Sequence, residues 1–79
     1  MHYTSEDLSV IAWARLMAES GRGRRARLRA GIGLVEAAET LGVHPSTLWR
    51  WEQGDRHPRR REALAYAALL KTAFGLSGP

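Results

Sequence analysis

Four side chains near the middle of the chain are spaced as one face of a helix and could make contacts to nucleic-acid bases. Positions i, i+3, i+4 and i+7 are held by Ser46, Trp49, Arg50 and Gln53. An arginine guanidinium can bind O6 and N7 of guanine together, and an indole ring can meet a thymine methyl group or lie against a sugar. On an exposed helix, this face could probe the edges of base pairs.

The helix that would carry these side chains is expected to run from Pro45 to Gln53. Proline suits the first helical position because its φ is already set and its missing N–H would be unpaired there. Leu48 and Trp51 share the opposite face and are expected to pack inward. Trp49 lies two residues from Trp51 and cannot face inward with it. It is therefore expected at the surface.

A shorter helix is expected just before it. Its apolar face follows helical spacing and consists of Leu34, Ala37, Ala38 and Leu41. Gly42 should end this helix, because glycine adopts the left-handed backbone conformation without a Cβ clash. Gly33 is a weaker cap for its start than serine or threonine. His44 stands at the cap of the second helix, where its ring either caps the helix or points at a ligand.

From about Arg24 to Leu70 the chain resembles the Cro/cI type of lambda-repressor-like helix-turn-helix domains. The small, glycine, aliphatic and large apolar positions of that motif are matched by Ala38, Gly42, Leu48 and Trp51. The segment Trp51 to Gly54, followed by Pro58, also matches the family's exit from its recognition helix. The resemblance implies a compact all-α fold of four or five helices with an additional N-terminal helix. It also implies sequence-specific binding of double-stranded DNA by a small phage Cro-like regulator, with repression as the simplest mechanism.

The resemblance also implies which residues meet DNA. Base contacts are expected from His44, Pro45, Ser46, Trp49 and Arg50. Phosphate contacts are expected from Thr47, Gln53, Arg56, His57, Arg59 and Arg60, with Arg61 in the same basic run. Alternatives stay open for three of them: Arg50 as a phosphate clamp, Thr47 as a helix-terminal cap, and Trp49 as a protein contact. Leu34 cannot make the phosphate contact that the family usually makes from its position.

One ion pair is implied in the same way. In the family, an arginine in the preceding helix commonly pairs with the glutamate that ends the recognition helix, and Arg27 and Glu52 occupy those positions. Such a pair would fix the pitch of the recognition helix. The alternative is two solvated surface charges that contribute about 0–1 kcal/mol.

Length and composition limit the remaining possibilities. The 79 residues are expected to form one domain, 1–79, and to leave no room for a large ligand cavity. The net charge of +4 and the eleven arginines among twelve basic residues favour a polyanionic partner, although a GC-rich genome would give the same arginine bias. Cysteine is absent and no metal-ligand spacing is present. We expect no enzyme activity, cofactor, metal or small-molecule ligand, no membrane contact, and a cytoplasmic, DNA-associated location.

Three further helices and no strand are expected. The first runs from about residue 4 to 20, is capped by Thr4 with Asp7, and carries an apolar stripe of Leu8, Ile11, Ala12, Trp13 and Leu16. The second runs from Arg22 to about Ala30 with Leu28 as its main inward residue. The last runs from Pro58 to about Phe74, with Gly75 closing it and Leu76 folding back. Its faces carry Leu64, Ala67, Ala68, and Leu70 or Lys71.

Partners remain open at this level. A twofold homodimer is the default on DNA, because two recognition helices about 34 Å apart meet successive major grooves. The N-terminal or the last helix would supply the dimer surface. One alternative is an excisionase-like architectural DNA-binding factor, although the helical pattern after Pro58 leaves no place for a two-stranded wing. Another is a protein-interaction module of the antitoxin or anti-repressor kind, and a weaker one is RNA binding through residues 22–29.

Overall fold

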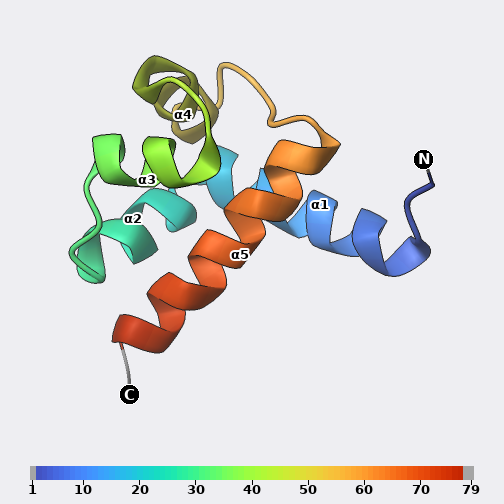
Figure 1. Ribbon diagram of the computed structural model, residues 1–79, viewed down its shortest axis with the longest axis horizontal. Helices are drawn as coiled ribbons and strands as arrows, with labels where there is room; N and C mark the ends of the chain where they lie inside the picture. Colours follow the sequence, from blue (N-terminus) through green and yellow to red (C-terminus); the bar gives the residue numbers. More distant parts are fainter. Residues whose placement is uncertain (1, 78–79) are drawn as a thin grey trace.

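The computed structural model describes residues 2–77, which form five α-helices. These are α1 (Ser5–Glu19), α2 (Arg22–Arg29), α3 (Leu34–Leu41), α4 (Pro45–Glu52) and α5 (Arg60–Ser77). No strand occurs within this range, so the expected all-α class is confirmed. Helix α5 runs diagonally across the molecule, and α1, α2 and α3 all pack against it, while α3 and α4 pack on each other (Figure 1).

Helix α1 begins where the sequence indicates but buries a different face. The Thr4 hydroxyl accepts a hydrogen bond from the Asp7 backbone N–H, and the Asp7 carboxylate accepts one from the Thr4 N–H, each at 3.0 Å. The expected stripe is wrong except for Ile11 and the half-buried Trp13, because Leu8, Ala12 and Leu16 are exposed. The buried face is Ile11, Ala14, Met17 and Ala18. Small alanines allow α1 to approach its neighbours closely, and this close packing decides which face turns inward.

The buried face of α2 also differs from the sequence expectation. Leu28 is 47% exposed, whereas Gly23, Ala26 and Arg27 are buried. A rule that places leucine inside and arginine outside fails here because Arg27 finds a buried partner, described below. A charged side chain with such a partner can occupy the core face.

The ends of α5 also differ from the sequence expectation. Pro58 is buried but lies before the helix, and the Arg59 backbone N–H is bonded to the Glu62 carboxylate at 3.1 Å, so the helix begins at Arg60. Gly75 does not end it: the helix continues to Ser77 and Leu76 is 65% exposed. Glycine inside a helix costs about 1 kcal/mol relative to alanine but does not force a turn.

The core lies where α5 crosses the other helices. Its buried apolar residues are Ile11, Ala14, Met17, Ala18, Ala26, Ala37, Ala38, Leu48, Trp51, Ala63, Tyr66, Ala67, Leu70 and Ala73. Trp51 and Tyr66 meet edge to face, with ring centroids 6.1 Å apart. Of the α5 residues expected along its faces, Ala67 and Leu70 are buried and Leu64 is half-buried, whereas Ala68 and Lys71 are exposed.

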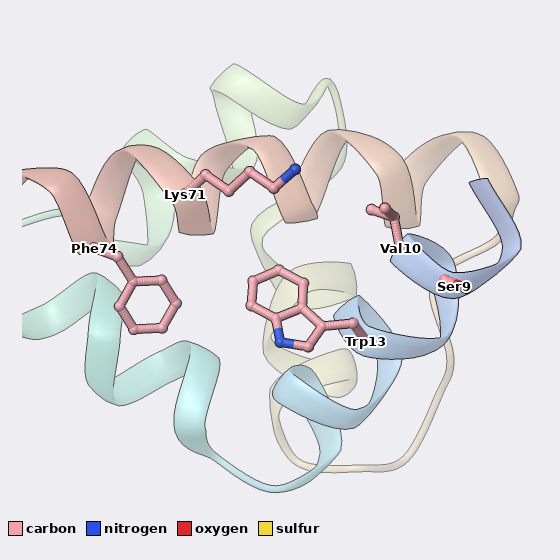
Figure 2. A pocket seen from close by; sticks show the side chains of 5 residues that line it. All are labelled: Ser9, Val10, Trp13, Lys71 and Phe74. Atoms are coloured by element: carbon pink, nitrogen blue, oxygen red, sulfur yellow. The ribbon is translucent and has the colours of Figure 1, made fainter. Parts of the chain in front are cut away.

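A hollow of about 370 Å³ separates the outer parts of α1 and α5. Figure 2 shows Trp13 of α1 and Phe74 of α5 pointing toward one another across it, with Lys71 above them. Their ring centroids are 6.3 Å apart. Trp13 is half-buried because it packs against the core and also lines this open hollow. No helix within residues 2–77 is long and apolar enough to cross a membrane.

Candidate nucleic-acid interface

The turn between α3 and α4 sets the direction of α4. Gly42 adopts a left-handed conformation with φ of 72°, as a helix C-terminus of this kind requires. The Gly42 N–H donates to the Glu39 carbonyl at 3.1 Å, and the Val43 N–H donates to the Ala38 carbonyl at 3.0 Å. These two bonds satisfy carbonyls that would otherwise be unpaired at the end of α3. Helix α4 therefore starts three residues later at a fixed angle.

His44 caps the start of α4. Its Nδ1 atom accepts a hydrogen bond from the Ser46 backbone N–H at 3.1 Å and lies 2.8 Å from the Ser46 hydroxyl oxygen. Because Nδ1 acts as an acceptor for the backbone, the ring proton of neutral His44 belongs on Nε2. The Ser46 hydroxyl then donates to His44, which leaves its oxygen available as an acceptor for a ligand.

Helix α4 has one locked face and one open face. Leu48 and Trp51 are 0% and 2% exposed, whereas Trp49 is 49% exposed. Ser46, Arg50 and Gln53 are exposed on the same side as Trp49. The Arg50 guanidinium makes no hydrogen bond or ion pair within residues 2–77. The outer face therefore offers an indole and a free guanidinium side by side.

The other residues expected at DNA lie around this face and in the segment that follows it. Pro45 and Thr47 are half-buried in the first turn of α4. Exposed positions in the loop and at the start of α5 are occupied by Arg56, His57, Arg59 and Arg60. Unlike Arg56 and His57 of the loop, Arg59 and Arg60 line a hollow shared with Tyr3 and Arg15. Sequence reasoning did not place Tyr3 or Arg15 near them.

Arg27 and Glu52 form a buried ion pair. Arg27 Nη2 lies 2.6 Å from Glu52 Oε1, and Arg27 Nε donates to Glu52 Oε2 at 3.1 Å. The two side chains are 3% and 1% exposed. Arg27 Nη1 also donates to the Ile32 carbonyl at 2.9 Å. The pair therefore joins α2 to the last residue of α4, rather than lying in solvent.

Tyr66 of α5 joins Arg27 and Glu52 in a network of three side chains, and this third member was not predicted from the sequence. Its hydroxyl donates to Glu52 Oε2 at 3.0 Å, so the carboxylate is held from α2 and from α5. Space for the hydroxyl comes from Gly23, where an added Cβ would overlap the Tyr66 oxygen. The spacing of Ala63, Tyr66, Ala67 and Leu70 is itself helical and was the available signal.

Because of this network, the free energy of unfolding should fall at alkaline pH. Burial and the adjacent Glu52 carboxylate raise the pKa of Tyr66 well above its usual value. Since the unfolded tyrosine ionises near pH 10, the stabilisation is fully present below about pH 10 and is lost as the pH rises further, by about 1.4 kcal/mol per pH unit. Urea unfolding at pH 9 and pH 11 should show this loss. Tyr66→Phe should remove the part due to Tyr66, and an unchanged alkaline slope in that variant would contradict the assignment.

Comparison with known proteins agrees with this geometry. A model of the helix-turn-helix domain family matches residues 24–74, which is more than half of the 79 residues and includes most of α2, all of α3 and α4, and most of α5. Searches of curated proteins and of solved structures give no match. The matched segment contains the α3–turn–α4 unit, the Arg27–Glu52 pair and the basic segment after α4. The chain therefore belongs to the helix-turn-helix domain family.

Proposed function

We propose that this protein is a non-catalytic transcriptional regulator that binds double-stranded DNA sequence-specifically, with α4 in the major groove. One observation carries the proposal: the face of α4 with Trp49 and Arg50 is open to solvent, while its opposite face is locked into the core by Leu48 and Trp51. A recognition helix needs both properties. Its side chains must reach base edges, and its axis must not move when they do.

The contacts follow from the placement of each group. Arg50 reads a guanine through bidentate hydrogen bonds, and Trp49 covers a thymine methyl group or a sugar beside it. His44, Pro45 and Ser46 approach bases from the start of α4, with the Ser46 oxygen as an acceptor. The backbone phosphates are met by Thr47, Gln53, Arg56, His57, Arg59 and Arg60. Phosphate contacts fix the register of the helix, and base contacts supply the specificity.

The biological role proposed here is repression by a small Cro-like regulator of the phage type. Bound to an operator that overlaps a promoter, the protein would block access of RNA polymerase. A twofold dimer on DNA would place two α4 helices about 34 Å apart, one helical turn of the duplex. The net charge of +4 favours association with DNA and a location on the nucleoid.

Selection from a pool of random duplexes tests the proposal directly. The full chain is expected to enrich one sequence motif containing a guanine that Arg50 reads. A dimer would show as two inverted half-sites with centres about 10 base pairs apart. Enrichment of no motif, with equal binding to every duplex, would exclude sequence reading. Enrichment of a single half-site would support sequence-specific binding but contradict the dimer.

The exposure of Trp49 favours a second candidate function, contact with a protein partner. Large exposed apolar side chains often mark such contacts. Under the DNA proposal, Trp49→Ala should weaken binding to the selected duplex and leave the secondary structure unchanged by circular dichroism. If its affinity for that duplex equals that of the unmodified chain, Trp49 does not contact DNA, and a protein-binding role becomes the better account of this residue.

A further inference from the structure

A cluster of four arginines lies beside the start of α5 and draws on a part of the chain outside the family match. A hollow of about 430 Å³ is lined by Tyr3, Arg15, Arg59, Arg60 and Arg61. Tyr3 and Arg15 come from the N-terminal segment and α1, which precede the matched residues 24–74. We call these five residues the arginine cluster.

Two contacts position Arg15, Arg60 and Tyr3 in the arginine cluster. Arg15 Nε donates to the Pro58 carbonyl at 3.0 Å and so ties α1 to the segment just before α5. The Arg60 guanidinium lies over the Tyr3 ring, 5.4 Å from its centroid. The first contact uses one of the five N–H groups of Arg15, and the second uses none of those of Arg60. Most donors of the cluster therefore remain available.

Within residues 2–77, no carboxylate forms an ion pair with an arginine of the cluster. The one ion pair in that range is Arg27–Glu52, which lies in the core and includes no residue of the cluster. The nearby Glu62 carboxylate accepts a hydrogen bond from the Arg59 backbone N–H, not from a guanidinium. Four like charges that line one hollow repel one another in the free protein. An anion bound among them would reduce this repulsion.

We propose that the arginine cluster binds phosphate groups of the DNA backbone flanking the base pairs read by α4, and that α1 thereby forms part of the DNA interface. This inference rests on the proposed function. Guanidinium groups match phosphate oxygens through paired N–H donors. Figure 1 shows that the loop after α4 leads directly to the start of α5, where α1 also lies. Since that loop carries the exposed Arg56 and His57, basic side chains continue from α4 to the cluster.

The variant Arg15→Gln separates charge from structure. The Nε2 atom of glutamine stands at the same place along the side chain as Nε of arginine, so the bond to the Pro58 carbonyl can be kept while the charge is removed. Arg61→Gln removes a cluster charge from an exposed side chain that makes no hydrogen bond or ion pair within residues 2–77. Lys71→Gln is the matched control, because it removes one charge at the α1–α5 hollow instead.

The measurement is the affinity for a duplex of unrelated sequence, and for the selected one, across a range of salt concentrations. Each cluster variant is expected to lower the slope of log affinity against log salt by about 0.9 for each chain bound, and the double variant by about twice that. The ratio of specific to nonspecific affinity should stay constant, since phosphate contacts carry no sequence information. Lys71→Gln should leave the slope unchanged.

Each other outcome has a definite meaning. If Arg15→Gln melts at the temperature of the unmodified chain and keeps its salt slope, α1 does not contact DNA and the inference is overturned. If Arg15→Gln fails to fold, an unchanged slope for Arg61→Gln overturns the cluster as a phosphate site. If the unmodified chain binds no duplex at any salt concentration, the proposed function itself fails, and this inference fails with it.

Discussion

Arg27→Ala is expected to lower the free energy of unfolding by about 3–5 kcal/mol, the usual cost of removing one partner from a buried ion pair. The substitution leaves the Glu52 carboxylate buried with only the Tyr66 hydroxyl as a donor, and it also leaves the Ile32 carbonyl without its bond from Arg27. A chain of this length has a total stability of roughly 4–12 kcal/mol. The loss is a large share of that total, so the variant should unfold at a much lower urea concentration than the unmodified chain, as urea titration followed by circular dichroism would show.

An apolar replacement of the whole network provides the control. In the triple variant Arg27→Met, Glu52→Leu and Tyr66→Phe, no buried polar side chain of the network remains without a partner. Such replacements are often neutral or stabilising, so most of the lost stability should return. A loss below 1 kcal/mol in Arg27→Ala would instead mean that water reaches Glu52 and that the pair behaves like a surface pair.

The triple variant also tests why the network exists. It keeps α4 packed through Leu48 and Trp51 but removes the directional bonds from α2 and α5 to the end of α4. If those bonds set the pitch of α4, the variant should be stable and yet discriminate poorly between the selected duplex and unrelated DNA. Full discrimination would show that packing alone positions the helix.

The α3–turn–α4 unit could be predicted from the sequence because its signals are local. Gly42 ends one helix through its own backbone, and Pro45 starts the next through its own ring. Leu48 and Trp51 are large and lie three positions apart, so together they define the inward face of α4. Trp49 and Arg50 cannot lie on that face, and the sequence therefore predicts them on the exposed one.

The inward faces of α1 and α2 could not be predicted in the same way. In α1, Leu8 and Leu16 form a stripe of the same period as the true one, and packing against α5, α2 and α4 selects the face with Ala14. In α2, the burial of Arg27 depends on Glu52, which is 25 positions away. The local spacing of apolar residues does not indicate which face of either helix is buried.

The residues at the edges of the site are also brought together by tertiary contacts. The ion pair between Arg27 and Glu52 was indicated only by family resemblance, and its third member Tyr66 was not. The residues Tyr3 and Arg15 approach the start of α5 only because α1 packs against α5. The helical spacing of Tyr66 predicts that it faces inward, but tertiary packing decides which side chains it meets there.

Arg50→Ala is expected to reduce affinity for the selected duplex by about 1–3 kcal/mol per recognition helix, or roughly 5- to 150-fold, while affinity for unrelated DNA changes little. The Arg50 side chain is exposed and makes no hydrogen bond or ion pair within residues 2–77, so the fold should not suffer. The ratio of the two affinities, measured at one salt concentration, is the informative quantity because nonspecific binding depends on phosphate contacts alone.

Arg50→Lys separates the two roles that an arginine on this face can play. Lysine keeps the positive charge but cannot form the planar pair of hydrogen bonds to guanine O6 and N7, so a base-reading Arg50 should lose most of its specificity in this variant. A phosphate clamp would behave differently, because a lysine ammonium also serves a phosphate oxygen. If Arg50→Lys retains the specific-to-nonspecific ratio and Arg50→Ala flattens the salt slope by about 0.9, Arg50 holds the backbone and another residue of α4 must read the bases.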